Sequence, residues 1–415
     1  MGQEIYKYVG ALNMLKVVAV ETALEIIKEN FSDTPLSTET VSLEDSLGRT
    51  LSEDIISKEN IPAFDRSTVD GYALKAADTY GSGESIPSQL DIIGEILMGE
   101  KAEGEIKDGQ CIKISTGGML PEGADSVVMV ENTDNRFGDI CLVYKSVSPF
   151  ENVNRKGDDI KEDTLIFTKG RKITSKEIGV LAALGISEVN VFRRPKVGII
   201  STGDEIVSVD TPLTFGKIRD INSHILSAFM REKGCETTHY GVVKDEYDPI
   251  LSKMQKAVSE NDIVLISGGS SAGARDMTVD IISKLGEVYL HGIAMKPGKP
   301  TIVGKIDGKA VFGLPGHPTA GYFVTLRLVK PLVDMMFSRK DGTRKIKAKT
   351  LQNISSNHGR EEILCVKLTN EGTMPVYGKS GVISLLAESD GYIIIDRNCE
   401  GLKVGDTTEI YLFQE

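Results

Sequence analysis

The sequence predicts a multidomain chain in which a central three-layer α/β domain follows a β-rich module and precedes a C-terminal β-barrel domain. Three observations lead to this prediction. The chain has 415 residues, and at roughly 150 residues per domain this length corresponds to two to four domains. Apolar strand-like runs alternate with helical periods in the middle of the chain. Short β-branched runs separated by Gly, Pro and Asp lie before and after that region.

Composition excludes several classes of protein. Lys and Arg number 48 against 60 Asp and Glu, a formal net charge of −12, so binding to nucleic acid is not expected. No run approaches roughly 18 apolar residues, so no membrane-spanning helix is expected. The five cysteines form no CxxC pair, which favours reduced thiols over disulfides or structural zinc. Residues 1–15 lack a basic segment and a cleavage site, so we expect no signal peptide and a cytoplasmic protein.

Helical signals lie on both sides of the β-rich part of the N-terminal half. Apolar residues recur at helical spacing over 20–27 and predict an amphipathic helix that ends near Asn30. Thr174 and Glu177 have capping-box spacing, and Gly185 suits the position after a helix, so TSKEIGVLAALGI predicts a second helix. Between them, the runs LDIIGEIL, CIKIS and SVVMV predict strands of an all-β module.

The middle of the chain alternates strands with helices. KVGIIS, THYGVV and DIVLIS predict buried strands. The helix INSHILSAFMREKG is closed by Gly234, and in DPILSKMQKAVSEN we expect Asp248 as the N-cap with Pro249 at the first helical position. Further helices and short strands are expected in MTVDIISKL, VYLHGIA, PTIVG, AVFGL and PTAGYFVTLRLVKPLVDMM. This alternation predicts a mostly parallel sheet with helices on both faces.

The last part of the chain returns to β structure. From about Lys340 the runs IKAKTL, ILCVKL, GYIIID and EIYLF are separated by polar turns. Such spacing predicts a separate β barrel or sandwich at the C-terminus.

Three unusual loops follow predicted parallel strands, where ligands bind in open α/β sheets. They are TGDE (202–205), GGSSAGARD (268–276) and PGHP (315–318). The glycine-rich loop leads into a helix, so its amides suit a phosphate group. Carboxylates from the neighbouring strand ends suit a divalent cation that bridges a pyrophosphate. Taken singly, each loop also fits a tight turn or a helix cap.

Two further segments carry candidate functional side chains. In MKPGKP (295–300), prolines and glycine would present Lys296 and Lys299 to an anion. In the β module, Asp65 and Asp70 lie in IPAFDRSTVDGYA, and Thr116 lies in STGGMLPEGAD. From residue types alone, these β-module loops fit either ligand binding or turn formation.

Together these segments resemble the MoeA family of molybdopterin molybdenumtransferases, which also includes the E domain of gephyrin. The matching strings occur in the family's order: PAFDRSTVDGYA, ISTGGMLPEGADSVVMVE, NVNRKGDDI, STGDEI, SGGSSAGARDMT, MKPGKP and GLPGHP. The resemblance implies an enzyme of molybdenum-cofactor biosynthesis that inserts molybdate or tungstate into adenylylated molybdopterin and releases AMP. It also implies a requirement for Mg²⁺, an elongated subunit, a homodimer and contact with the molybdopterin adenylyltransferase of the pathway.

The resemblance implies four domains. They are a discontinuous N-terminal domain (15–44 and 150–194), a β-rich module (45–149), an α/β domain similar to MogA and MoaB (195–339) and a C-terminal β-barrel domain (340–415). The α/β assignment agrees with the strand–helix alternation described above.

Residue roles carried over from the resemblance fall into three groups. The catalytic residues would be Asp65, Thr116, Glu205, Asp245, Asp276 and Lys296. The substrate-binding residues would be Asp159, Gly268, Gly269, Gly273, Lys299, Pro315, Pro318 and Ser384. Mg²⁺ would be held by Glu205 and Asp276.

The sequence departs from the family pattern at His317 and at Gly292. His317 occupies the position of the Asn in the commoner string GLPGNP. Gly292, next to His291, stands where a bacterial pattern has a Lys. Both departures lie beside loops that would form the site.

Two alternative functions would use some of the same residues as the transferase. A Mg²⁺-dependent nucleotide phosphohydrolase or adenylyltransferase could use the same α/β domain, but it would not need the motifs of the β module. A non-catalytic molybdopterin-binding scaffold would not need the carboxylates and lysines listed above. The transferase accounts for both sets of residues.

Overall fold

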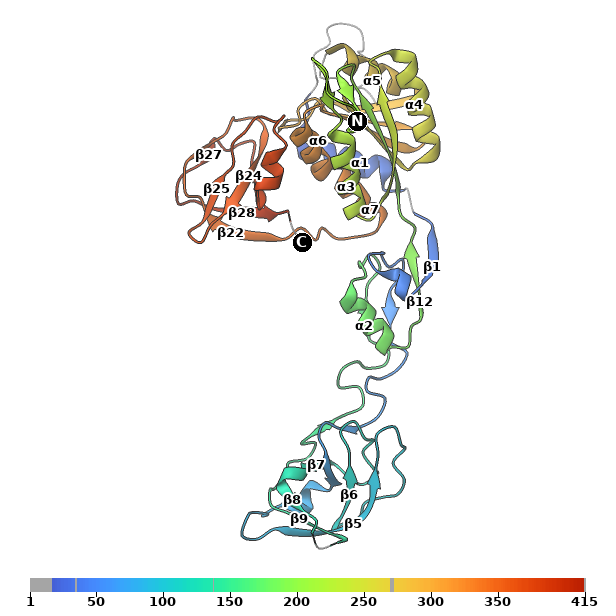
Figure 1. Ribbon diagram of the computed structural model, residues 1–415, viewed down its shortest axis with the longest axis vertical. Helices are drawn as coiled ribbons and strands as arrows, with labels where there is room; N and C mark the ends of the chain where they lie inside the picture. The colour runs from blue at the N-terminus through green and yellow to red at the C-terminus, as the bar shows by residue number, and fades with distance from the viewer. Residues whose placement is uncertain (1–16, 34–35, 137, 269–271, 414–415) are drawn as a thin grey trace, which may run out of the picture. The chain divides into compact units, whose positions relative to one another are not determined.

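The computed structural model describes residues 17–33, 36–136, 138–268 and 272–413 (Figure 1). The chain divides into two compact units. The large unit contains the residues up to Glu39, Gly48–Ser52 and everything from Asn190 onward, and the small unit contains Thr40–Leu47 and Glu53–Val189. The expected lack of a signal peptide and the role of Gly269 concern residues outside the described ranges. The four predicted domain boundaries are finer than this division and stay a prediction.

A six-stranded sheet forms the centre of the large unit, with the strand order β16-β13-β17-β21-β20-β18. The first four strands of this order run parallel, and β20 is antiparallel to both of its neighbours. The strand bounds are β13 Lys196–Thr202, β16 Glu236–Val243, β17 Ile263–Gly268, β18 Gly286–His291, β20 Ile302–Ile306 and β21 Lys309–Leu314. The mostly parallel sheet predicted from the sequence is therefore present.

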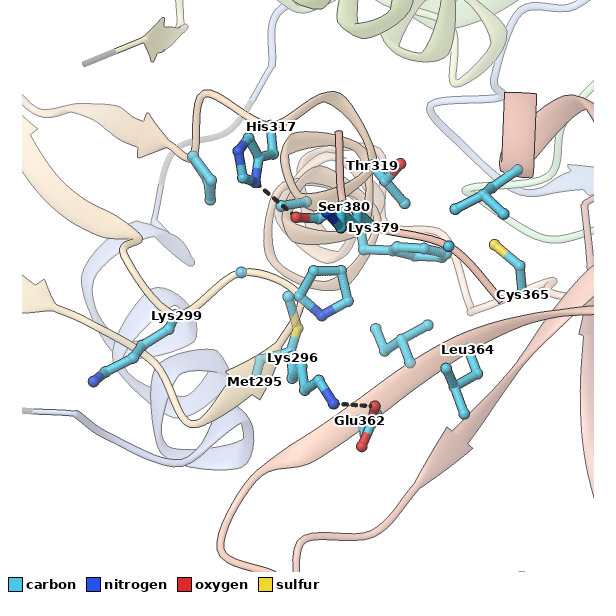
Figure 2. A pocket seen from close by; sticks show the side chains of 18 of the residues that line it. Met295, Lys296, Lys299, His317, Thr319, Glu362, Leu364, Cys365, Lys379 and Ser380 are labelled. Carbon is cyan, nitrogen blue, oxygen red and sulfur yellow. Dashed lines mark hydrogen bonds and ion pairs between the residues drawn. The ribbon is translucent and has the colours of Figure 1, made fainter. Parts of the chain in front are cut away.

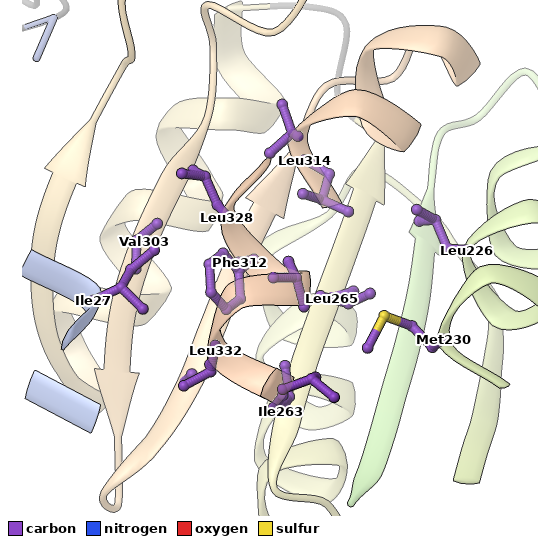
Figure 3. Packing of buried hydrophobic residues seen from close by; sticks show 14 of the residues in the cluster. Ile27, Leu226, Met230, Ile263, Leu265, Val303, Phe312, Leu314, Leu328 and Leu332 are labelled. Carbon is purple, nitrogen blue, oxygen red and sulfur yellow. The ribbon is translucent and has the colours of Figure 1, made fainter. Parts of the chain in front are cut away.

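Helices cover both faces of this sheet because its strands alternate apolar side chains between two cores. Along β17, Ile263 and Leu265 belong to one buried cluster, whereas Val264 and Ile266 belong to the other. Figure 3 shows the first cluster, where Phe312 and Leu265 pack against residues of α1, α3 and α7. Helices α4 and α5 cover the second face. The helix bounds are α1 Val20–Phe31, α3 Asn222–Glu232, α4 Tyr247–Glu260, α5 Ala272–Leu285, α6 Pro318–Val324 and α7 Lys330–Met336.

Two helices differ from the expectation. Helix α4 begins at Tyr247 after Glu246, so the prediction of Asp248 as N-cap was wrong by two residues. Pro249 is tolerated there because the first-turn amides have no acceptor within the helix. The helix predicted over 318–336 contains a π-helical turn at Thr325–Val329, just before Pro331, whose ring crowds the preceding turn. Among the described helices, none is long and apolar enough to cross a membrane.

The C-terminal β domain belongs to the large unit and shares a strand with the α/β part. Its sheet has the order β19-β24-β26-β28-β22, with β25 paired to β24. Strand β19, Met295–Lys296, comes from the α/β part and lies parallel to β24. The other bounds are β22 Lys345–Lys349, β24 Glu361–Leu368, β25 Thr373–Pro375, β26 Gly391–Ile395 and β28 Thr407–Leu412, with the short elements β23 Ile354–Ser355, β27 Gly401–Leu402 and α8 Ser384–Glu388.

The small unit is built on a second six-stranded sheet, with the order β7-β4-β6-β5-β9-β8. Its bounds are β4 Gly71–Leu74, β5 Ser88–Ile96, β6 Gln110–Ile114, β7 Ser126–Met129, β8 Thr133–Asp134 and β9 Ile140–Val143. Short pairs are formed by β2 Ile55–Ile56 with β11 Leu165–Phe167, and by β3 Arg66–Ser67 with β10 Val153–Asn154. The chain passes between the units along β1 Thr38–Ser42 and β12 Glu188–Phe192, which also pair.

Helix α2 of the small unit, Ser175–Ala183, begins with the predicted capping box. The Thr174 hydroxyl and the Thr174 amide both donate to Glu177, and the Arg171 guanidinium donates to the same carboxylate at 2.6 Å. Glu177 is 3% exposed. Burial alone would raise the pKa of Glu177, but the bonds from Thr174 and Arg171 outweigh it and lower the pKa to about 2.

We expect Glu177→Gln to destabilise the small unit by about 3 kcal/mol at pH 7, because the folded state holds the carboxylate ionised. The pKa of Glu177 in the folded state, about 2, lies below its ordinary value of 4.5. The stabilisation from the ionised carboxylate is therefore fully present at pH values above the pKa of the unfolded state. It is lost as the pH falls toward 2. Urea unfolding followed by circular dichroism should therefore show a wild-type advantage at pH 7 that shrinks through acid pH.

Glu188→Gln is the matched control, because it makes the same change at an exposed position on β12. An equal loss of stability in both variants, or a Glu177→Gln effect that does not depend on pH, would contradict the role of the capping box.

Candidate functional site

The parallel strands of the large unit end at one edge of the sheet. In register, Thr202 lies beside both Val243 and Gly268, and Ser267 lies beside Leu314. The three loops predicted from the sequence therefore start from neighbouring strands. A Cβ atom at Gly268 would lie 2.0 Å from the Thr202 carbonyl oxygen, so this position accepts only glycine.

Acidic residues gather at this edge around Asp245. The Asp245 amide donates to Asp204 Oδ1 at 3.4 Å. Burial raises the pKa of Asp245, a hydrogen bond from Thr202 opposes this, and the charges of Asp204 and Glu205 raise the pKa further. Asp245 Oδ1 is buried and has no hydrogen-bond partner among the described residues. An unpaired buried carboxylate oxygen of this kind suits a cation or a hydrogen-bond donor supplied by a ligand.

Two other buried polar atoms lie at or beside the same edge, Ser201 Oγ at the end of β13 and Asn222 Oδ1, and neither has a hydrogen-bond partner within the described part of the chain. Asn222 donates to Ser267 Oγ at 2.7 Å and to the Gly316 carbonyl at 2.8 Å. It therefore ties the end of β17 to the PGHP loop. No sequence motif indicated Asn222, although its spacing of four residues from the buried Leu226 places a polar residue on the buried face of α3.

The remaining predicted residues of this edge are on α5. Gly273 and Asp276 lie in α5, which follows β17, and Asp276 is half-buried. Over the described ranges, no three or more His, Cys, Asp or Glu side chains form a cluster that could hold a metal ion. A Mg²⁺ site formed jointly with substrate needs only one or two carboxylates, because phosphate oxygens and water complete it. The unpartnered oxygen of Asp245 fits such a site, while Glu205 and Asp276 remain predicted ligands.

A pocket of about 660 Å³ lies between the loops of the α/β part and the C-terminal β domain (Figure 2). It contains the predicted residues Lys296, Lys299 and Pro315. It also contains Arg360 and Lys379, which the sequence reasoning missed because they follow no recognised motif. Pro318 and Ser384 flank the pocket, since their neighbours His317, Thr319 and Leu385 line it. Apolar lining comes from Met295, Ala320, Phe323, Ile363, Leu364, Cys365, Val376 and Leu385.

The segment that carries Lys296 forms backbone contacts with two other parts of the chain. Val18 donates its amide to Gly292 and accepts from the amide of Ala294, and Lys296 itself lies opposite Glu362 on β24. Lys296 Nζ lies 2.7 Å from Glu362 Oε1, and Figure 2 shows this contact while Lys299 points in another direction. Contacts with Val18 and with Glu362, which are far from Lys296 in the sequence, thus fix the position of this lysine.

His317 connects the two walls of the pocket. Its Nδ1 lies 2.6 Å from Ser380 Oγ, a contact drawn in Figure 2. The Thr319 amide also donates to the Ser380 carbonyl at 3.2 Å. His317 therefore attaches the PGHP loop to the loop that follows β25. His291, the other histidine noted in the sequence, ends β18.

In the small unit, hydrogen bonds join the predicted loops to one another. Asp65 Oδ1 accepts from the Lys156 amide at 2.7 Å. The amide and the hydroxyl of Thr116 donate to Asp70 Oδ1 at 2.7 and 3.0 Å, and these bonds lower the pKa of Asp70. Asp159 is exposed and its amide donates to the Ile61 carbonyl at 3.0 Å. Asp65 and Asp70 thus hold turns together, and Thr116 keeps an exposed position beside them.

Comparisons with known proteins cover almost the whole chain. Family models match at residues 18–185 (MoeA N-terminal region, domain I and II), 198–334 (probable molybdopterin binding domain) and 347–413 (MoeA C-terminal region, domain IV). A putative molybdopterin biosynthesis protein of Methanocaldococcus jannaschii is 35% identical over 96% of this chain and 98% of its own length. The molybdopterin molybdenumtransferase of Haemophilus influenzae is 32% identical over 91% of this chain and 95% of its own length.

Solved structures agree with these matches. The crystal structure of a molybdopterin biosynthesis MoeA protein from Pyrococcus horikoshii OT3 has a TM-score of 0.85 and 32% identity, and it covers 96% of this chain and 100% of its own. A second structure from Pyrococcus horikoshii has a TM-score of 0.83 and 39% identity, with the same coverage. The predicted fold class is thereby confirmed. From the three family matches and the near full-length relatives, the chain belongs to the MoeA family.

Proposed function

We propose that this chain is a molybdopterin molybdenumtransferase, which inserts molybdate or tungstate into adenylylated molybdopterin and releases AMP. The observation that carries the proposal is the PGHP loop, which two anion-binding regions share. Asn222 binds Gly316 of this loop at the strand ends, and Pro315 and His317 line the cationic pocket. A reaction that couples cleavage of a phosphoanhydride, with release of AMP, to insertion of the metal from an oxyanion needs two such regions side by side.

The strand ends would bind the pyrophosphate of the substrate. Glycine at 268 lets β17 pack closely against Thr202 of β13 at the strand ends. Thr202 donates to Asp245, and the other carboxylate oxygen has no partner among the described residues. Glu205, Asp245 and Asp276 are the residues that would hold Mg²⁺. When bound, Mg²⁺ would neutralise charge on the phosphates as the AMP leaves.

The pocket would hold the oxyanion and the dithiolene of the substrate. Lys296, Lys299, Arg360 and Lys379 supply positive charge for molybdate. Cys365 lies in the apolar wall, and burial raises the pKa of its thiol to about 11. The Cys365 thiol is therefore neutral at pH 7, so it neither repels the oxyanion nor competes with the dithiolene sulfurs as a thiolate.

The proposal also covers the cellular location, the oligomeric state and the partners of the protein. We infer that the protein acts in the cytoplasm as a homodimer and contacts the adenylyltransferase that supplies its substrate. Asp65 and Thr116 of the small unit would take part in catalysis, and Asp159 would bind substrate. Their loops are already joined within that unit.

The direct test is AMP release from adenylylated molybdopterin with Mg²⁺, titrating molybdate and tungstate separately. Release that depends on either oxyanion is expected, and the lower half-saturating concentration would identify the preferred metal. Release without an oxyanion would indicate a phosphohydrolase, and tight binding without release would indicate a scaffold.

We expect Asp245→Asn to reduce AMP release by about a hundredfold or more, because the amide cannot replace the carboxylate at the charged phosphates. The thermal midpoint should stay the same or rise. The pKa of Asp245 is raised in the folded protein, so ionisation of this group opposes folding at neutral pH.

Asp248→Asn is the matched control, since Asp248 is exposed in the first turn of α4. Wild-type AMP release by the Asp245→Asn variant would remove Asp245 from the site.

We expect Lys296→Gln to raise the half-saturating molybdate concentration by about tenfold, because one charge-assisted contact to the oxyanion is lost. The maximal rate at saturating oxyanion should change less. Lys345→Gln removes the same charge from β22, where Lys345 pairs with Glu409, and should leave the molybdate dependence unchanged. An unaltered dependence in Lys296→Gln would exclude Lys296 from oxyanion binding.

A further inference from the structure

Glu362 is the one acidic side chain among the described residues that line the cationic pocket. The residue is 5% exposed. Its Oε1 lies 2.7 Å from Lys296 Nζ, and its Oε2 accepts from the Ser356 hydroxyl at 2.8 Å. A carboxylate directed at a lysine of an anion-binding pocket occupies the position that an oxyanion would need.

The ion pair is not required to hold the two strands together. Met295 and Lys296 already pair through the backbone with Glu361 and Glu362. Glu361 is also anchored by two hydrogen bonds from Arg327, each 2.9 Å long. Strand β24 therefore stays in place without the Glu362 carboxylate, and this carboxylate is available for another role.

We propose that Glu362 is an internal counter-ion that neutralises Lys296 in the empty pocket and must release it when an oxyanion binds. The proposal rests on the proposed function, since it concerns the same oxyanion. The Lys296 side chain is 48% exposed, whereas the Glu362 side chain is buried. A buried carboxylate without a partner would be strongly disfavoured, so the ion pair with Lys296 stabilises the empty pocket. Because a dianion such as molybdate is repelled by the same carboxylate, Glu362 also sets the concentration at which the oxyanion enters.

The inference is tested by equilibrium dialysis of the full chain against molybdate, with AMP release measured in parallel. Glu362→Gln keeps the side-chain shape and a hydrogen bond with Ser356, and it should lower the molybdate dissociation constant by about tenfold. Glu409→Gln removes the same charge from β28 of the same domain and should leave binding unchanged. Circular dichroism and the thermal midpoint establish that each variant is folded.

A double-mutant cycle separates a counter-ion from a structural residue. If Glu362 acts through Lys296, then Lys296→Gln should weaken molybdate binding more in the Glu362→Gln background than in the wild type. A purely structural role would give the same factor in both backgrounds. Glu362→Asp, which keeps the charge but shortens its reach, should give an intermediate affinity and serves if Glu362→Gln does not fold.

Unchanged or weaker molybdate binding in a folded Glu362→Gln variant would contradict the proposal that Glu362 is a counter-ion of Lys296. The absence of molybdate binding in every variant would contradict it as well. Failure of the proposed function looks different: wild-type AMP release would then be independent of oxyanion. In that case the dialysis result would still decide whether Glu362 controls the pocket.

Discussion

The pairing of β19 with β24 is the interaction on which the pocket of the large unit depends. Two residues of the α/β part, Met295 and Lys296, enter the sheet of the C-terminal domain. The two parts also share one core, since Ile363 and Cys365 of β24 join the buried cluster that contains Phe312. The pairing places Lys296 opposite Glu362. Without this pairing, the lysine of the proline-rich loop would have no fixed partner.

In the large unit, the centre of the sheet is apolar, whereas the carboxyl ends of its strands carry polar groups. Over most of β17 both faces are covered by apolar side chains, and the strand is buried throughout its centre. At the carboxyl ends the pattern changes, and polar atoms of Ser201, Asn222 and Asp245 are buried with no partner among the residues that the structure describes. Such atoms lower the stability of the folded chain unless something binds them. The apolar core therefore supports an edge that is arranged for a ligand.

The carboxylates of the two units have different local tasks. In the small unit, Asp65 and Asp70 accept hydrogen bonds from loop amides, and Glu177 fixes the start of a helix. In the large unit, Asp245 lacks such a partner on one oxygen, and Glu362 faces a lysine. A carboxylate that receives several amide bonds shapes a turn, whereas one that is left open or paired with a pocket cation is available for exchange with a ligand.

The sequence by itself determined the α/β alternation, the capping box at Thr174, the family and the loops that end the strands, because these depend on periodicity and on residues close together in the chain. It did not place the first residue of α4, and it missed Asn222, Arg360 and Glu362. Asn222 and Glu362 gain their roles from partners far away in the chain, at Ser267, Gly316 and Lys296. Only the tertiary structure decided which carboxylates are satisfied and which are left open, since burial and pairing depend on contacts that no local pattern records.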